Sequence, residues 1–269
     1  SGDGPLIVEI STLGPVWSGH PVSFALVTAE NRQFAAFYDA ERAMTVAART
    51  LQRGPWQRVR LPTTLGWDSH NRVSMAVDAL GRVHVSGNMH NDPLVYYRTR
   101  APFDITAFER IPSMVGPDER RVTYPEFFHG PDGSLVFVYR DGGSGSGNHI
   151  FNAYDAATGR WSRLLDTALT DGEGVRSAYP VGPLRGPDGL WHLVWVWRDT
   201  PDASTNHDLS YACTSDLVAW YAGSGRRLTL PITLGRSDIV DPVPTGSGMI
   251  NNNTKVGFDQ RNRPVVAYH

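Results

Sequence analysis

One short pattern, a pair of alternating apolar strands joined by a tight turn, occurs five times in this chain of 269 residues and constrains its fold most strongly. Period-two alternation on both sides of a turn that contains Gly or Asn is typical of a β-hairpin. The five turns follow one another at spacings of 50, 52, 56 and 73 residues. The hairpins span residues 20–39, 70–90, 123–140, 178–198 and 251–269. Such a regular period predicts one repeated structural unit.

A second, weaker pair of strands follows most of these hairpins, for example over residues 149–164 and 208–223. Four strands per unit and a period of fifty-odd residues match a propeller blade, so we expect an all-β chain that forms a β-propeller of four-stranded blades. A two-sheet sandwich is the alternative, but it does not explain the same turn at a nearly constant period. Residues 39–51 are rich in helix formers, yet they suit an outer strand about as well.

The last repeat ends at His269, on the second strand of its hairpin. A blade that stopped there would leave an open sheet edge, which folded proteins avoid. We therefore expect residues 1–269 to form a single propeller domain that is incomplete at its C-terminal end, with about five blades visible. A missing segment or a second chain is expected to complete the propeller.

Composition excludes several classes of partner. A formal net charge of −2 gives no general attraction for nucleic acid or for an anionic membrane, so any anionic ligand must be held by a local cluster of charges. No apolar run approaches the roughly 18 residues that suggest a membrane span. The single cysteine, Cys213, excludes an internal disulfide.

The polar residues of the repeat gather at the open ends of the hairpins. In an antiparallel hairpin the first residue of one strand and the last residue of the next lie at the same end, and in a propeller these ends share one face around the central channel. Ordinary exposure would favour Ser, Lys, Glu and Gly there, so groups that transfer protons beside permanent cations indicate a functional site. The first strands of the hairpins begin at His20, His70, Tyr124, Tyr179 and Asn251–Asn253. The second strands end at Tyr38, His90, Arg140, Arg198 and His269.

A second group of metal-ligand types lies behind the hairpins. His149 and His207 each follow an Asn, Cys213 comes six residues after His207, and His192 lies in a neighbouring strand. Nitrogen and sulfur ligands suit zinc, so we expect a structural zinc bound by His192, His207 and Cys213. The spacing matches no standard zinc motif. Inert packing of the buried cysteine, and substrate binding by His149, are the alternatives.

The chain resembles the BNR-4 type propellers, which include ulvan lyases and related rhamnose–uronic acid-cleaving enzymes. The resemblance spans about residues 15–269 and is strongest in SHNRVSMAVDALGRVHVSGNMHNDPLVYYRT, TYPEFFHGPDGSLVFVYRDGGSGSGNHIFNAYD and TNHDLSYACTSDLVAW. It implies seven blades in the complete protein, an anionic polysaccharide substrate, and a secreted or periplasmic enzyme. It also implies that two histidines, a tyrosine and an arginine surround a uronic acid, and the matching residues are His70, His90, Tyr124 and Arg140. Further residues expected to bind substrate are Tyr179, Asn252, Arg198 and His149.

The residue types suit β-elimination at a 4-linked uronic acid. The C5 proton becomes acidic only when the charge of the adjacent carboxylate is neutralised, and Arg140 can stabilise the enolate-like charge that develops. Tyr124 and His70 are expected to carry the two proton transfers, in an order that the sequence leaves open. His90 is expected to bind or orient the carboxylate. No cofactor is needed for this step.

Two other functions remain open from the sequence. A propeller glycoside hydrolase is suggested by TSDLVAW, which also occurs in five-bladed glycosidases, but hydrolases normally need two carboxylates, and the hairpin ends offer only Asp39 and Glu126. A related enzyme resembling α-L-rhamnosidases, which would use histidine on the same scaffold, also remains open. A non-catalytic carbohydrate-binding propeller would use Trp67, Trp195 and Trp197 as stacking platforms. The products distinguish the three, because only a lyase forms an unsaturated sugar.

Overall fold

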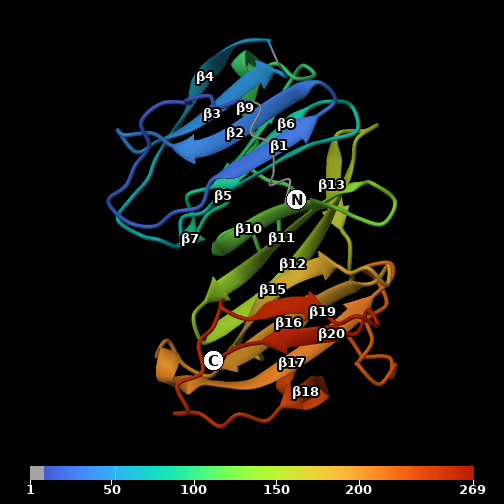
Figure 1. Cartoon of the computed structure of the whole chain (residues 1–269). Coiled ribbons are helices and arrows are strands. Elements are labelled where there is room, and N and C mark those ends of the chain that lie inside the picture. The colour runs from blue at the N-terminus through green and yellow to red at the C-terminus, as the bar shows by residue number, and fades with distance from the viewer. Residues whose placement is uncertain (1–8, 52) are drawn as a thin grey trace, which may run out of the picture.

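The computed structural model describes residues 9–51 and 53–269, and almost all of its regular structure is β-strand (Figure 1). Each of the first two sheets is antiparallel and has four strands in chain order. The first contains β1 (Ala25–Ala29), β2 (Arg32–Tyr38), β3 (Ala43–Thr50) and β4 (Arg53–Thr64). The second contains β5 (Val73–Val77), β6 (Val83–Gly87), β8 (Tyr96–Thr99) and β9 (Phe108–Arg110).

Two further four-stranded units and a final hairpin follow. The third unit contains β10 (Val122–His129), β11 (Leu135–Gly143), β12 (Ser146–Asp155) and β13 (Arg160–Arg163). The fourth contains β15 (Ser177–Arg185), β16 (Trp191–Arg198), β17 (Asn206–Thr214) and β18 (Asp238–Asp241). The short strands β7 (His90–Asp92) and β14 (Thr170–Asp171) pair with β10 and β12, and one parallel pairing joins β12 to β15. The final hairpin consists of β19 (Lys255–Phe258) and β20 (Pro264–Ala267).

The five predicted hairpins are all observed. They appear as β1–β2, β5–β6, β10–β11, β15–β16 and β19–β20. Residues 39–51, whose composition suited a helix and a strand about equally, contain the strand β3. Three of the turns carry Gly81, Gly133 and Gly189 with φ angles of 79°, 80° and 81°, a left-handed conformation that glycine adopts without steric cost.

The hydrophobic cores lie between consecutive sheets rather than within one. Three large cores join the first unit to the second, the second to the third and the third to the fourth, through pairs such as Met44 and Val85, Tyr96 and Phe137, and Phe151 and Trp195. Burial of one such side chain contributes roughly 1.5–3 kcal/mol. Because the middle strands are covered on both faces, β16 is buried along its whole length except at Arg198. Several four-stranded antiparallel sheets that repeat in chain order, each packed on its neighbours, are the arrangement of β-propeller blades.

Helical structure in the described residues is limited to three single turns, η1 (Ile105–Ala107), η2 (Ala203–Thr205) and η3 (Leu234–Arg236). None of these turns has the length or apolar character of a membrane-spanning helix. The last hairpin packs onto the fourth unit, because Val266 of β20 contacts the core around Val196 and Leu209. Completion of the propeller by a missing segment or a second chain stays a prediction.

Candidate active site

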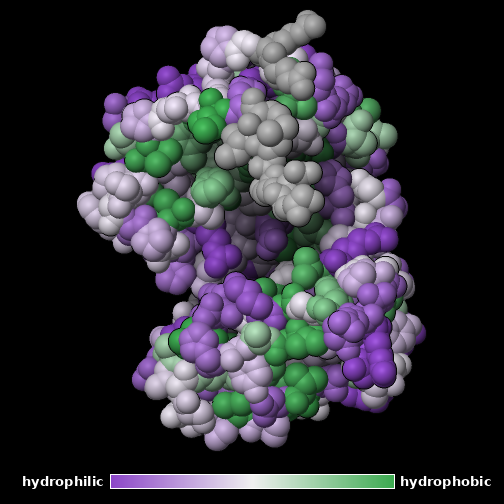
Figure 2. All heavy atoms as spheres, in the orientation of Figure 1, coloured by the Kyte–Doolittle hydropathy of each residue, from purple (hydrophilic) through white to green (hydrophobic). Residues whose placement is uncertain are grey.

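The open ends of several hairpins meet in one cluster of polar side chains. The ring centroids of His70 and His90 are 4.0 Å apart, and those of His70 and Tyr124 are 5.9 Å apart. The Arg140 guanidinium lies 5.1 Å from the Tyr124 ring. The surface is hollowed between the upper and lower groups of sheets, and hydrophilic side chains border this hollow (Figure 2). The four residues predicted to be catalytic therefore lie together.

Asp68 holds the two histidines in place. Its Oδ1 contacts Nδ1 of His70 at 2.6 Å, and its Oδ2 contacts Nδ1 of His90 at 2.5 Å. Burial raises the pKa of Asp68, but hydrogen bonds from the His70 backbone N–H and from both imidazoles outweigh it and lower the pKa to about 2. An ionised carboxylate only accepts hydrogen bonds, so Nδ1 of each histidine carries a proton. The Nε2 of each imidazole is then the nitrogen that can accept a proton when the ring is neutral.

Tyr124 has a strained backbone within a β-bulge. Its φ is 57°, and the register between β10 and β11 shifts between Thr123 and Glu126. A bulky residue with positive φ is a genuine outlier, and bulges redirect side chains beside active sites. Burial, the largest cause, and Tyr179 raise the pKa of the Tyr124 hydroxyl, and the pKa is raised on balance although Arg140, Asn252 and Arg72 act to lower it. Tyr124 therefore stays protonated at neutral pH.

Three arginines surround the two tyrosines of the cluster. Arg72 and Arg140 lie 4.9 Å and 5.1 Å from the Tyr124 ring, and Arg198 lies 5.3 Å from the Tyr179 ring. Within residues 9–51 and 53–269, none of the three has a carboxylate oxygen within 4 Å. Arg140 is buried, and its guanidinium donates to Gly142 O and to the hydroxyls of Tyr179 and Thr123. A buried cation without a carboxylate partner is ready to bind an anion.

A small pocket of about 40 Å³ lies beneath this cluster. His149 lies at its wall and is buried, and burial lowers the pKa of its imidazole to about 3, so His149 is neutral. Its Nδ1 has no hydrogen-bond partner among the described residues. The other polar residues of the lining are Arg72, Tyr124, Glu126, Arg140 and Asn252.

Tyr179 lies deeper than the sequence suggested. It was expected to bind substrate, but only 2% of its surface is exposed. Its hydroxyl accepts from Arg140 and Arg198, both at 3.3 Å, and donates to Ser144 at 3.0 Å. Tyr179 is therefore placed to orient the two arginines from behind. Arg198 is half-buried, as a residue at the rim of the site would be.

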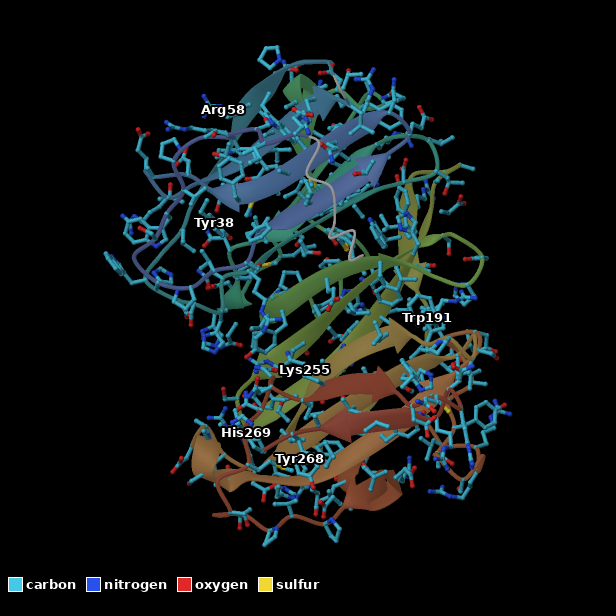
Figure 3. The ribbon with its side chains drawn as sticks, viewed as in Figure 1. Tyr38, Arg58, Trp191, Lys255, Tyr268 and His269 are labelled. Atoms are coloured by element: carbon cyan, nitrogen blue, oxygen red, sulfur yellow. The ribbon has the colours of Figure 1, made fainter. Side chains whose placement is uncertain are left out.

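The remaining hairpin-end residues occupy different surroundings. Asn252 donates to the Tyr124 hydroxyl at 3.3 Å, so the last hairpin reaches the site. His269 lies two residues beyond Ala267, which pairs with Lys255, and it is therefore at the open end of the last hairpin (Figure 3). Its ring contacts Asn253 and does not join the cluster. His20 contacts Trp17 and Trp67 instead.

Two residues of the site were not predicted. Asp68 precedes His70 by two residues and accepts its backbone N–H, a local turn whose signal is the WDSHN sequence. Arg72 lies just before β5, in a chain rich in arginine, and no local signal separates it from the other arginines.

The predicted zinc set is wrong. His192 pairs with Cys213 across β16 and β17, but His207 pairs with Trp197 at the other end of the same two strands. Six residues along a strand correspond to about 20 Å, so the three side chains cannot share one ion. Both nitrogens of His192 also have partners, the Tyr211 hydroxyl at 2.7 Å and Asp188 at 3.0 Å. In the described part of the chain, ligand atoms of three side chains come together only at Asp68, His70 and His90.

Comparison with known proteins gives a family and several curated relatives. Residues 32–269 match the family described as "BNR repeat-containing family member". The long isoform of ulvan lyase from Alteromonas sp. is 28% identical over 134 residues, which cover 35% of this chain and 13% of that protein. The long isoform from Pseudoalteromonas sp. (strain PLSV) is 50% identical over 42 residues, 16% of this chain and 4% of that protein. The chain thus matches only a small part of the length of these relatives.

Solved structures share the fold over almost the whole chain. The polysaccharide lyase Uly1 superposes with a TM-score of 0.76 and 18% identity, covering 96% of this chain and 68% of that one. A PL25 ulvan lyase bound to -[GlcA(1-4)Rha3S]- gives a TM-score of 0.67 and 12% identity over the same shares. Together with the match over residues 32–269, this shows that the chain is a β-propeller that belongs to the BNR repeat-containing family.

Proposed function

We propose that this protein is a polysaccharide lyase that cleaves a 4-linked uronic acid in a rhamnose- and uronate-containing, ulvan-like polysaccharide by β-elimination. The observation that carries the proposal is the buried Arg140 guanidinium, which has no carboxylate partner in the described chain and lies beside Tyr124 and the Asp68-bound histidines. The curated relatives named as ulvan lyases support the same reaction class.

Arg140 and Arg72 supply the charge neutralisation. The substrate carboxylate enters the small pocket between them, where the guanidinium of Arg140 is already fixed by Tyr179 and Thr123. Neutralisation of the carboxylate makes the C5 proton acidic and stabilises the enolate-like charge that forms when this proton leaves. Donors that are oriented before the reaction do this without reorganisation cost.

His70 and Tyr124 carry the two proton transfers. Nε2 of His70 takes the C5 proton, and Asp68 stabilises the resulting imidazolium through its contact with Nδ1. The electron pair of the C5–H bond forms the C4–C5 double bond as the C4–O4 bond breaks. Tyr124 donates its proton to the departing O4, a role for which its raised pKa suits it better than for the base. His90 stacks on His70 and helps to orient the carboxylate.

The two alternative functions find less support. Of the two carboxylates that a hydrolase would use, only Glu126 lines the pocket. Asp39 is occupied by the Arg60 side chain and by the backbone N–H groups of Glu41 and Ala43. For a non-catalytic binding propeller, Trp195 and Trp197 are unsuitable platforms because both are fully buried.

We further propose that the enzyme is secreted or periplasmic, that its partner is an anionic polysaccharide rather than nucleic acid or a membrane, and that catalysis needs no cofactor.

The lyase function is tested by incubating the protein with ulvan and following ultraviolet absorbance together with the masses of the products. Unsaturated uronic acid ends support the lyase. New reducing ends without unsaturation indicate a hydrolase, and binding without cleavage indicates a carbohydrate-binding protein; either result overturns the proposal.

A further inference from the structure

An exposed aromatic cluster lies beside the candidate active site and has no role in the elimination. Trp67 is 74% exposed, although a side chain of this size usually packs into a core. Its ring meets the edge of Trp17 at a centroid distance of 5.1 Å and an interplanar angle of 78°. Trp17 is fixed in turn by a hydrogen bond from its Nε1 to Nδ1 of His20 at 3.1 Å. Trp67 is therefore a supported platform that faces solvent.

The guanidinium of an arginine, Arg42, lies near both tryptophan rings. The guanidinium of Arg42 lies 5.7 Å from the Trp17 ring and 5.9 Å from the Trp67 ring. The backbone carbonyl of Arg42 accepts the N–H of Leu65 at 2.8 Å, which holds the segment that leads to Trp67 against the Arg42 turn. No carboxylate oxygen of the described residues lies within 4 Å of Arg42.

The platform is next to the catalytic residues in the chain. Trp67 directly precedes Asp68, and consecutive Cα atoms are about 3.8 Å apart. Asp68 in turn binds both His70 and His90. The space beside Gly66 is open, since no heavy atom outside its chain neighbours Leu65 and Trp67 lies within 4 Å of where a Cβ would be. Because Trp67 is exposed and directly precedes Asp68, a polymer with one sugar at the catalytic residues can bring a neighbouring sugar to Trp67.

We propose that Trp67 and Arg42 form a subsite for a neighbouring anionic sugar of the polysaccharide, in which the indole stacks on the sugar ring and the guanidinium binds its carboxylate or sulfate ester. The subsite rests on the proposed lyase function for its place in catalysis. The aromatic face supplies apolar contact with the ring, and the planar guanidinium suits both kinds of oxyanion.

The first experiment compares Trp67→Ala with the wild type on ulvan oligosaccharides of increasing length. We expect KM to rise about 10-fold for long oligosaccharides, with kcat nearly unchanged and the shortest cleavable oligosaccharide unaffected. Trp67→Phe should restore most of the affinity. Trp56→Ala is the matched control, because the Arg49 guanidinium lies 4.8 Å from the Trp56 ring and Trp56 is at the far end of β4. An unchanged KM in Trp67→Ala, or an equal rise for short and long substrates, overturns the proposal.

The second experiment identifies the anion. Arg42→Gln should raise KM for long sulfated oligosaccharides by a similar factor. If the difference from wild type disappears on chemically desulfated oligosaccharides, Arg42 binds the sulfate ester, and if it persists, Arg42 binds a carboxylate. No difference on either substrate contradicts the anion part of the proposal.

A binding measurement separates this subsite from the lyase function. The affinity for long ulvan oligosaccharides is measured by titration calorimetry under conditions without turnover, and cleavage is followed separately under assay conditions. If the wild type binds them but cleaves none, and Trp67→Ala binds more weakly while Trp56→Ala does not, the lyase proposal fails and the subsite stands. If cleavage occurs and Trp67→Ala binds as the wild type does, the subsite fails and the lyase proposal stands.

Discussion

At the scale of single residues, the backbone conformation of Tyr124 places its ring in a position that a regular β-strand would not give. Its positive φ within the bulge of β10 brings the ring 4.9 Å from Arg72 and 5.1 Å from Arg140. Such a conformation costs of order 1–3 kcal/mol and persists only when its surroundings enforce it. Here Thr123 accepts from Arg140 and from the N–H of Asn91, which fixes the strand on one side of the bulge.

Replacement of Tyr124 by phenylalanine tests its role as proton donor. Tyr124→Phe keeps the aromatic ring between the arginines but removes the hydroxyl, so we expect kcat on ulvan to fall by about 100-fold. Thermal unfolding should change little, because within the described residues the hydroxyl makes one hydrogen bond, with Asn252. Turnover close to that of the wild type would remove Tyr124 from the mechanism.

We expect turnover to depend most strongly on Arg140, because its guanidinium stabilises the negative charge that develops on the substrate. Arg140→Ala removes donors that are fixed before the reaction, and kcat should fall by about 100-fold or more. Arg100→Ala serves as the control, because its side chain is exposed and paired with Glu109 in the second unit. Steady-state kinetics of both variants on ulvan give the comparison. Normal turnover of a folded Arg140→Ala protein contradicts the site assignment.

Asp68 should make the stability depend on acid pH. Its folded pKa of about 2 lies below the ordinary value of 3.8, so ionised Asp68 stabilises the fold above about pH 4, and this contribution is lost as the pH falls toward 2. The wild type should therefore lose stability relative to Asp68→Asn between about pH 4 and pH 2. Urea unfolding of both proteins at several pH values measures the difference. Parallel pH profiles would mean that the folded and unfolded pKa values are alike.

At the scale of elements, a turn aspartate, a strand histidine and a tyrosine of the next strand connect the strands of a sheet. In the fourth unit His192 of β16 binds the Tyr211 hydroxyl at 2.7 Å and Asp188 of the preceding turn at 3.0 Å. In the second unit His84 makes the same contacts with Tyr96 and Asp78. Since all polar atoms of these buried imidazoles have partners, the histidines hold turn and strands together without an unsatisfied group.

His192→Ala should act through stability. The change leaves a cavity and removes both hydrogen bonds, so the free energy of unfolding should decrease by about 2–3 kcal/mol. The folded fraction should keep normal kcat, because His192 lies far along the strand from Arg198 at the open end. Urea denaturation gives the first quantity and kinetics the second. The exposed His129 supplies a control, His129→Ala, with a loss below about 1 kcal/mol.

At the scale of the whole molecule, the site exists only because the units stack around one axis. Asp68 and His70 come from the loop before β5, Tyr124 and Arg140 from the third unit, and Asn252 from the segment before β19. Asn252 and Tyr124 are 128 residues apart in the chain and within hydrogen-bond distance in space. Loss of the cores between neighbouring sheets would therefore disperse the site even if each sheet stayed intact.

Several sequence-based interpretations needed tertiary structure to correct them. Trp195 and Trp197 looked like stacking platforms, yet both are buried, because sheets pack on both faces of β16. His207 and Cys213 looked like neighbours, but six residues of extended strand separate them. Tyr179 was expected to touch substrate and instead lies behind Arg140 and Arg198. In each case the error concerned which neighbours a side chain meets.

The sequence by itself determined the strands, the turns and the ends of the hairpins at which His70, His90, Tyr124 and Arg140 gather. These features depend on local alternation, on turn residues and on a repeating period, all of which are written in the order of residues. Only the tertiary structure decided that Asp68 bridges both histidines and that Arg140 is buried without a carboxylate partner in the described chain. Burial, pKa and charge pairing depend on groups that distant segments bring together, and no local pattern encodes those distances.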